Sequence, residues 1–265
     1  MVDMMKKKYL SLFLTFIIIF FACNNSVDLV SPIDLKGKIL ITPIEKFTSN
    51  NRILVFSCIT ADPFPSDVDS MYYTLNSIDN NISLNFLFLT RGKYIPPETP
   101  SEWVIEQDIE LGKYDIGNYI INIKIPDYLK DIYHLNITND YYEFISENES
   151  GIIFTNKKLM KIPEHTIWGQ ITISNEDTTL AYKLIDSLLS VGASKIKFGI
   201  GNYGYFVVDD STQFFINSVK ESNYYYYKFA LSFNQNINKI KEISNYFKYK
   251  NNISFYIFDT DGNQY

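Results

Sequence analysis

The stretch Leu111-Gly112-Lys113-Tyr114-Asp115-Ile116-Gly117-Asn118-Tyr119-Ile120-Ile121-Asn122-Ile123 is the part of the chain that says most about its fold. Gly117 stands two residues before Tyr119, and Tyr119, Ile121 and Ile123 then follow at every second position. Successive side chains of a β-strand point to opposite faces, so this spacing puts the three residues on one face. The stretch predicts a strand that is entered through a turn and buries one side.

The segments before it show the same period of two. We expect further strands at 37–43, 53–60, 70–78 and 82–90. In the last of these, alternation predicts that one face carries Ile82, Leu84, Phe86 and Phe88. Pro43 cannot donate a ladder hydrogen bond, so the strand at 37–43 is expected at a sheet edge. Short strands with turn signals between them favour a β-sandwich.

Gly117 and Tyr119 resemble the tyrosine corner of immunoglobulin-like sandwiches, in which the ring packs inside while the hydroxyl ties down the preceding turn. The resemblance implies an all-β immunoglobulin-like domain over residues 34–137. The disulfide pair and the paired Trp of antibody-type domains are missing from this sequence. Domains of this kind serve as spacers and as adhesive or docking modules in unrelated proteins, so the fold alone does not give the function.

The N-terminus carries a targeting pattern. Lys6-Lys7-Lys8 precede an apolar run from Tyr9 to Ala22, and Cys23 follows. This resembles the signal peptide of a bacterial lipoprotein, and it implies a leader over 1–22, lipidation of Cys23 and a tether over 23–33. Phe20 and Phe21 are bulkier than the usual residues before such a cysteine. The alternative is an uncleaved anchor helix, although the apolar run of about 14 residues is short for a span.

Charge and cysteine content bear on compartment and partners. The net charge is −6, and removal of the leader, with three lysines and Asp3, makes it −8. An acidic protein is a poor candidate for binding nucleic acid or an anionic membrane surface through general electrostatics. Asn24 after Cys23 is not the Asp that resembles an inner-membrane retention signal, so we expect the outer membrane, with the body facing either the periplasm or the exterior.

The remaining reactive residue types predict no catalytic, metal or cofactor site. Cys58 shares the face of Leu54 and Phe56 in a strand and is expected to be a buried small hydrophobe. His134 and His165 sit in no spacing that closes a metal shell, so surface or packing roles are expected for both. Residues 138–165 are interpreted as a junction, mainly an exposed acidic loop with a short strand at 151–154.

In the second half, residues 166–265, the period changes. Strands are expected at 167–173, 195–200, 205–208, 224–233 and 253–258. Helical spacing predicts one helix from about Thr178 to a C-terminal cap at Gly192, and another that begins after Asn236. This order favours a ferredoxin-like α+β domain, a split βαβ sandwich. Its helices cover one face of the sheet, so we expect the other face to be the binding surface.

Three apparent motifs are weak. Gly199-Ile200-Gly201-Asn202-Tyr203-Gly204 matches a dinucleotide fingerprint, but Tyr205-Phe206-Val207-Val208 is β-prone where a helix is required, which favours a hairpin. Asp259-Thr260-Asp261-Gly262-Asn263 starts like a calcium loop but has no closing Glu. Asp209-Asp210 are adjacent and point to opposite sides of a strand, so a turn is the better interpretation.

The run Tyr224-Tyr225-Tyr226-Tyr227 is the one unusual feature of the second half. If Tyr225 and Tyr227 are exposed beside Tyr203 and Tyr205, the four residues form an aromatic platform for sugar rings or a protein partner. The alternative is ordinary sheet packing.

These observations together predict a non-catalytic, lipid-anchored cell-envelope protein that acts as a structural or docking module and binds another envelope protein. A carbohydrate- or small-ligand-binding lipoprotein is the first alternative. The second is an envelope hydrolase, which requires carboxylates, or a Ser-His pair involving His134 or His165, to converge in a cleft.

Overall fold

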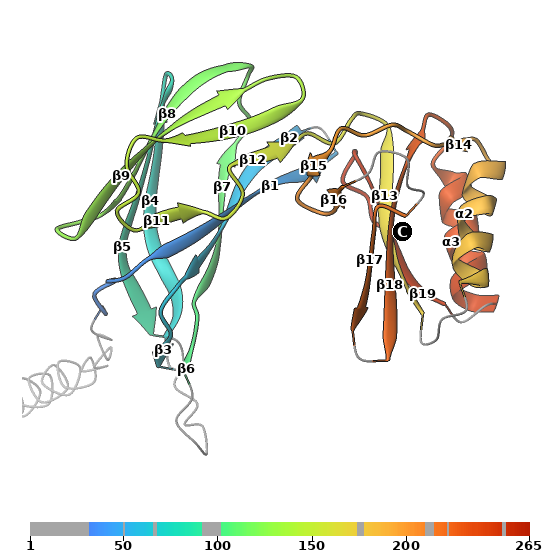
Figure 1. The fold of residues 1–265 in the computed structure, drawn as a ribbon, viewed down its shortest axis with the longest axis horizontal. Helices are drawn as coiled ribbons and strands as arrows, with labels where there is room; N and C mark the ends of the chain where they lie inside the picture. Colours follow the sequence, from blue (N-terminus) through green and yellow to red (C-terminus); the bar gives the residue numbers. More distant parts are fainter. Residues whose placement is uncertain are drawn as a thin grey trace, which may run out of the picture.

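The computed structural model describes residues 32–49, 51–65, 68–91, 102–173, 178–209, 215–221, 223–250 and 253–265. Of these, 57% lie in strands and 12% in two helices, which confirms a β-rich fold with a small helical part. The predicted leader and Cys23 lie outside the described residues. Figure 1 shows two lobes, an N-terminal lobe of strands and a C-terminal lobe in which two helices cover one face of a sheet. Neither helix is long and apolar enough to cross a membrane among the residues described.

The N-terminal lobe contains two sheets with a core between them. The first has the order β11-β1-β2-β7, formed by β11 (Ile152–Phe154), β1 (Ile39–Thr48), β2 (Asn51–Thr60) and β7 (Glu106–Gly112). The second has the order β16-β15-β12-β10-β9-β8-β5-β4, formed by β16 (Val207–Val208), β15 (Gly201–Asn202), β12 (Lys158–Met160), β10 (Tyr141–Ser146), β9 (Leu129–Ile137), β8 (Gly117–Ile125), β5 (Asn81–Arg91) and β4 (Val68–Ile78). A small ribbon pairs β3 (Phe64–Pro65) with β6 (Glu102–Trp103).

The stretch around Tyr119 behaves as its pattern predicts. Ile121 and Ile123 on β8 are fully buried, and the partly buried ring of Tyr119 packs against the same core. Its hydroxyl donates a hydrogen bond of 3.1 Å to the backbone carbonyl of Asp115, four residues earlier. The side chain therefore ties the entry turn to the strand.

The face of Phe88 on β5 differs from the one that the period of two predicts. The pairing of β4 with β5 is irregular between Tyr72 and Tyr73, so Leu89 is buried and Phe88 leaves the face of Phe86 to stack on Tyr72. One extra residue at a bulge reverses the face of everything after it.

The first strand also extends beyond its predicted end. β1 continues past Pro43 to Thr48, and its pairing with β11 stops at Ile41. Pro43 therefore lies where the missing donor costs little, although the start of β1 is not an edge. Residues 141–160, interpreted above as part of a junction, form β10, β11 and β12 of the two sheets.

The C-terminal lobe has one antiparallel sheet with the order β14-β18-β13-β19, and β17 also pairs with β18. Its elements are β13 (Thr166–Ile173), α2 (Thr179–Ser190), β14 (Ala193–Ser194), β17 (Asn217–Glu221), β18 (Tyr224–Phe233), α3 (Asn238–Lys250) and β19 (Ser254–Asp259). The Asn236 carboxamide accepts a hydrogen bond of 3.0 Å from the Asn238 N–H, as expected of a residue that caps α3. Gly192 follows α2 with φ +107°, a conformation that favours glycine.

The segment after β14 is where the sequence prediction fails. Residues 195–199 form no strand, and Phe198 instead enters a core shared by the two lobes. The chain then makes a short hairpin, with Gly201 opposite Val208 and Asn202 opposite Val207, and this hairpin joins the N-terminal lobe's sheet through Leu159. The match to a dinucleotide fingerprint is thus a hairpin, as its β-prone flank predicted.

Gly169 on the central strand β13 provides a test of the C-terminal lobe. A Cβ atom there would lie 2.1 Å from the Tyr256 carbonyl oxygen and 3.1 Å from the Phe229 ring. We expect Gly169→Ala to lower the free energy of unfolding by about 1–3 kcal/mol, the usual cost of overpacking a core. Urea unfolding measures this. Gly112→Ala is the control, because nothing lies within 4 Å of a Cβ atom there while φ is +114°, so its cost reports backbone strain without a contact. A Gly169→Ala protein with an unchanged free energy of unfolding would contradict the packing around Gly169.

Candidate site at the junction of the lobes

A third hydrophobic core joins the lobes. Phe47, near the end of β1, lies 5.0 Å from the Trp168 ring of β13 and 6.2 Å from the Tyr205 ring. Trp168 and Ala230 point away from the helices, toward the sheet face that was expected to be free. The buried members of this cluster are Phe47, Ile162, Trp168, Phe198, Tyr203, Phe206, Val208, Ile216 and Ala230. The N-terminal lobe and residues 196–208 therefore occupy much of that face, which corrects its assignment as an open binding surface.

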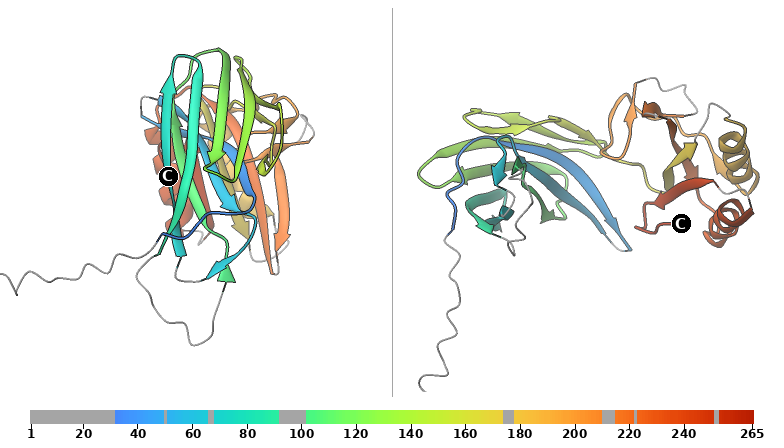
Figure 2. Two further views of the ribbon diagram at one scale, coloured as in Figure 1. Left: turned by 90° about the vertical axis from the view of Figure 1, so that its left-hand side faces the viewer. Right: turned by 90° about the horizontal axis from the view of Figure 1, so that it is seen from below.

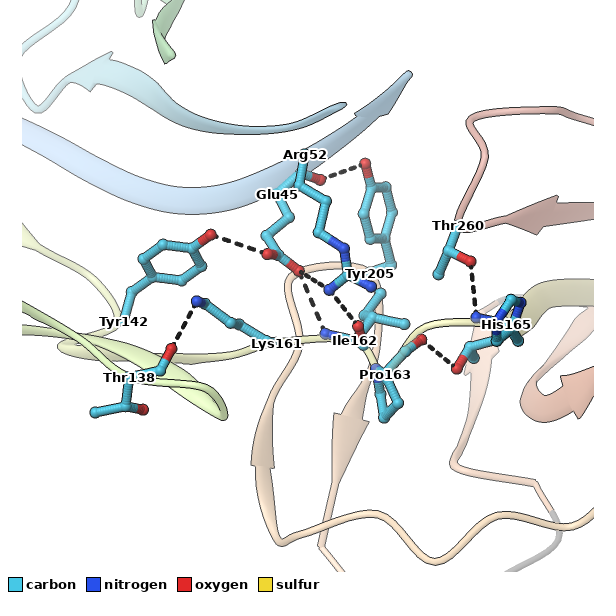
Figure 3. A network of polar contacts seen from close by, with 11 residues as sticks. Glu45, Arg52, Thr138, Tyr142, Lys161, Ile162, Pro163, His165, Tyr205 and Thr260 are labelled. Carbon is cyan, nitrogen blue, oxygen red and sulfur yellow. Dashed lines mark hydrogen bonds and ion pairs between the residues drawn. The ribbon is translucent and has the colours of Figure 1, made fainter. Parts of the chain in front are cut away.

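Glu45 is the polar centre of the junction (Figure 3). Its side chain is fully buried, and one carboxylate oxygen accepts a hydrogen bond of 3.0 Å from the Tyr142 hydroxyl. The other accepts one of 3.3 Å from the Ile162 N–H. The Glu45 backbone carbonyl accepts a further one of 2.7 Å from the Tyr205 hydroxyl. Both carboxylate oxygens are thus satisfied, as a buried carboxylate requires.

Arg52, on the neighbouring strand β2, is the cation of the cluster. Its Nη1 lies 3.9 Å from a Glu45 carboxylate oxygen and donates a hydrogen bond of 2.5 Å to the Ile162 carbonyl. The guanidinium also lies over the Phe47 ring, 5.2 Å from its centroid. Nη2 is buried and has no hydrogen-bond partner among the described residues.

Residues 161–165 connect β12 to β13 and form the linker between the lobes. Hydrogen bonds hold this linker at both ends. The Lys161 ammonium donates to the Thr138 carbonyl at 2.6 Å and lies 4.6 Å from the centre of the Tyr142 ring. At the other end, the Thr166 hydroxyl donates to the Pro163 carbonyl at 2.7 Å, and the His165 N–H donates to the Thr260 hydroxyl at 3.1 Å. Figure 3 shows these contacts on both sides of the linker.

The junction shifts the acidity of its groups. Burial raises the pKa of Glu45 above its ordinary value of 4.5, although Arg52, Tyr142 and the Ile162 N–H oppose that shift. Burial also lowers the pKa of Lys161, and the Arg52 charge acts in the same direction. Burial raises the pKa of the Tyr142 phenol, and the adjacent Glu45 adds to the rise. Shifted pKa values occur in structural ion-pair networks as well as in functional sites, so these shifts alone do not assign a catalytic role to Glu45, Lys161 or Tyr142.

Two cavities flank the linker and share Arg52, Lys161 and Glu164. The first, of about 440 Å³, is lined by Thr48, Ser49, Asn51, Arg52, Lys113, Tyr114, Tyr142, Lys161, Glu164, His165, Thr260 and Asp261. The second, of about 700 Å³, is lined by Arg52, Asn139, Asp140, Tyr141, Lys158, Met160, Lys161, Ile162, Pro163, Glu164, Lys197, Phe198, Gly199 and Tyr203. Both volumes fall within the range of small-molecule sites.

The four tyrosines of the predicted platform are not brought together. Tyr203 is buried against Phe198 and Phe206, and Tyr205 bonds to Glu45 across the junction. Tyr227 packs instead with the helix-side core of the C-terminal lobe. Tyr225, two residues earlier on the same strand, lies on that same side of the sheet.

The other sequence motifs have structural explanations. Cys58 is fully buried, and burial raises the pKa of its thiol. His134 is exposed and lies 2.6 Å from a Glu147 carboxylate oxygen. In the calcium-like loop, the Asp259 carboxylate accepts the N–H groups of Asp261 and Asn263. No group of three or more His, Cys, Asp or Glu in the described ranges is arranged to hold a metal ion.

Glu45 was not predicted as a site residue, although its position in the sequence contains a signal for it. Glu45 continues the inward-facing series of Ile39, Ile41 and Phe47 on β1, so an acid stands where the alternation requires an apolar residue. The strand was expected to end at Pro43, which left Glu45 outside the pattern. A charged residue in an inward register is the signal that points to it.

Asp209 of the adjacent acidic pair is exposed at the end of the hairpin, and Asp210 lies outside the described residues. Comparison with known proteins gives no relative from which a role for any of these residues could be transferred: no family model, no curated protein and no solved structure matches the chain.

Proposed function

We propose that the protein is a lipid-anchored, non-catalytic component of the bacterial cell envelope, in which the N-terminal lobe is a spacer and the C-terminal lobe docks another envelope protein. The observation that carries this proposal is the path of β1. It starts at the end of the N-terminal lobe remote from the C-terminal lobe and ends with Phe47 against Trp168 (Figures 1 and 2). The start of β1 and the layer formed by α2 and α3 therefore lie at opposite ends of the described structure (Figure 1).

The finer fold assignments belong to this proposal. The Tyr119 hydroxyl bond to Asp115, and the two sheets packed around one core, support an immunoglobulin-like assignment for the N-terminal lobe. The order β14-β18-β13-β19, with antiparallel neighbours and both helices on one face, supports a ferredoxin-like split βαβ assignment for the C-terminal lobe.

Lipidation of Cys23 supplies the anchor in this proposal. We propose that residues 23–33 act as a tether between this anchor and the start of β1, so that the N-terminal lobe separates the membrane from the C-terminal lobe. A lipid chain attached by the modification machinery requires no membrane-spanning helix. Asn24 at the next position makes the outer membrane the preferred location.

The docking surface we propose is the outer side of α2 and α3, which is the part of the described chain farthest from β1's start (Figure 1). Tyr249 is 86% exposed there and Tyr246 is 52% exposed. The same two helices expose Lys183, Lys239, Lys241 and Lys248 against Asp186 and Glu242. This is a basic surface on an acidic protein, and exposed tyrosines are enriched in interfaces, so an acidic protein surface is the expected partner.

The double variant Tyr246→Ala, Tyr249→Ala tests this surface. We expect in-cell crosslinking of the lipidated protein, followed by mass spectrometry, to recover one envelope protein in near-stoichiometric amount with the wild type. The double variant is expected to recover at least tenfold less, because loss of two aromatic anchors typically removes 2 kcal/mol or more of binding energy, or roughly this factor.

Tyr128→Ala is the matched control, since Tyr128 is 51% exposed on the N-terminal lobe. Equal loss of the partner in the control and in the double variant would argue against the helical layer. Recovery of the wild-type protein alone would argue against docking altogether.

A second candidate function, small-ligand binding by an envelope lipoprotein, is favoured by the cavity of about 700 Å³ beside the linker.

A further inference from the structure

We propose that the larger junction cavity binds a small organic phosphate, whose phosphate group is held by cations drawn from both lobes. This inference deepens the second candidate function and depends neither on the lipid anchor nor on the docking surface. It begins from the distribution of charge. The lining holds the cations Arg52, Lys158, Lys161 and Lys197 and the acids Asp140 and Glu164, in a protein whose net charge is −6.

The cations come from three separate parts of the chain. Arg52 belongs to β2, Lys158 and Lys161 lie at β12 and the linker, and Lys197 belongs to the segment after β14. Folding brings four cations and two acids to one concave surface, and this excess of positive charge favours an anion there. The lowered pKa of Lys161, which burial causes and Arg52 reinforces, agrees with an excess of positive charge at this wall.

The geometry leaves donors available for an anion. Arg52 uses Nη1 for the Ile162 carbonyl and for Glu45, while Nη2 is buried with no hydrogen-bond partner among the described residues. Lys158 and Lys197 are exposed at the cavity, and the Lys158 ammonium lies 3.8 Å from the centre of the Tyr141 ring. Arginine and lysine together supply the planar donors and point charges that phosphate oxygens accept.

The remaining lining favours an organic group on that phosphate. The cavity of about 700 Å³ is much larger than an inorganic anion requires. The half-buried Tyr141 and the exposed Gly199 line it, so a ring of the ligand has aromatic surface to contact at Tyr141. Asp140 and Glu164 provide acceptors for ligand hydroxyl groups. A phosphorylated sugar or a compound of similar size satisfies both requirements.

Isothermal titration of the full chain with glucose 6-phosphate and with inorganic phosphate tests the proposal. We expect saturable binding of at least the first probe, with affinity falling as salt rises. The variant Lys158→Gln, Lys197→Gln should weaken binding at least tenfold. Both residues are exposed and neither takes part in the hydrogen bonds of the junction described above, so the fold should be retained.

The control is Lys124→Gln, Lys130→Gln, which removes the same charge from two exposed positions paired across β8 and β9. Binding by the control within twofold of wild type supports a site at the cavity. Equal weakening in the two double variants would show general attraction of anions and overturn the proposal. Absence of binding to both probes, in a protein that unfolds cooperatively, would overturn it as well.

Discussion

Glu45→Ala is expected to lower the free energy of unfolding by about 3–5 kcal/mol, which is the usual cost of removing one partner from a buried ion pair. The substitution leaves the Tyr142 hydroxyl and the Ile162 N–H without their acceptor. It also removes the carboxylate 3.9 Å from Nη1 of the partly buried Arg52 guanidinium. Urea unfolding followed by circular dichroism measures the loss.

Glu110→Ala, on β7 of the same sheet, is the matched control. Glu110 pairs with Lys46, the residue after Glu45, at 2.5 Å, but both side chains are about half exposed. Exposed ion pairs contribute about 0–1 kcal/mol, so this variant should unfold almost as the wild type does. If Glu45→Ala cost no more than Glu110→Ala, Glu45 would not hold the junction together.

Asp131→Ala is expected to have the second large effect, a loss of about 3 kcal/mol or more, because charged hydrogen bonds contribute about 1.5–3 kcal/mol each and are not fully additive. The fully buried Asp131 carboxylate accepts the backbone N–H groups of Ser150, Gly151 and Ile152 at 2.8–3.0 Å. These bonds fix the turn that leads into β11. Asp131→Asn, which keeps the volume and one acceptor oxygen, should lose less, and equal losses would contradict the role of the second oxygen.

The same two carboxylates should affect stability in opposite directions as pH changes. Burial acts to raise the pKa of Asp131, but its backbone N–H donors outweigh burial and hold the pKa below 3.8. Its contribution is therefore present above about pH 4 and is lost as the pH falls through the folded-state pKa. The pKa of Glu45 is raised above 4.5, so its ionisation opposes folding and stability falls as the pH rises through that pKa.

Unfolding free energies of the wild type and two isosteric variants, measured from pH 3 to pH 8, test these signs. Glu45→Gln should remove the decline above about pH 4.5, and Asp131→Asn should remove the gain near pH 4. A Glu45→Gln profile parallel to that of the wild type would show that the Glu45 pKa is not raised by folding.

Local pattern predicted most of the secondary structure. The strand expected at 224–233 is β18, and the helix expected after Asn236 is α3. The β-rich fold with a small helical part was predicted from the period of two around Tyr119 and from the change of period after residue 166. These features depend on residues close together in sequence, where alternation and capping act directly.

The junction was not predictable in the same way. Glu45, Arg52, Tyr142 and Tyr205 lie up to 160 residues apart, and only the docking of the two lobes brings them into contact. The segment 195–200 has the alternating pattern of a strand, but in the structure Phe198 is buried in the hydrophobic cluster between the lobes. The four-tyrosine platform failed for a related reason, since Tyr205 is used to bind Glu45 while Tyr227 faces the helices.

We expect the contacts of Glu45 at the junction to hold the two lobes as one rigid body, so that the distance between the start of β1 and the proposed docking surface is fixed. Spin labels on Lys130→Cys and Asn245→Cys, two exposed positions in different lobes, allow that distance to be measured by pulsed electron paramagnetic resonance. We predict a single narrow distance distribution in the otherwise wild-type protein and a broad one when Glu45→Ala is added. A broad or two-peaked distribution with Glu45 intact would contradict the account.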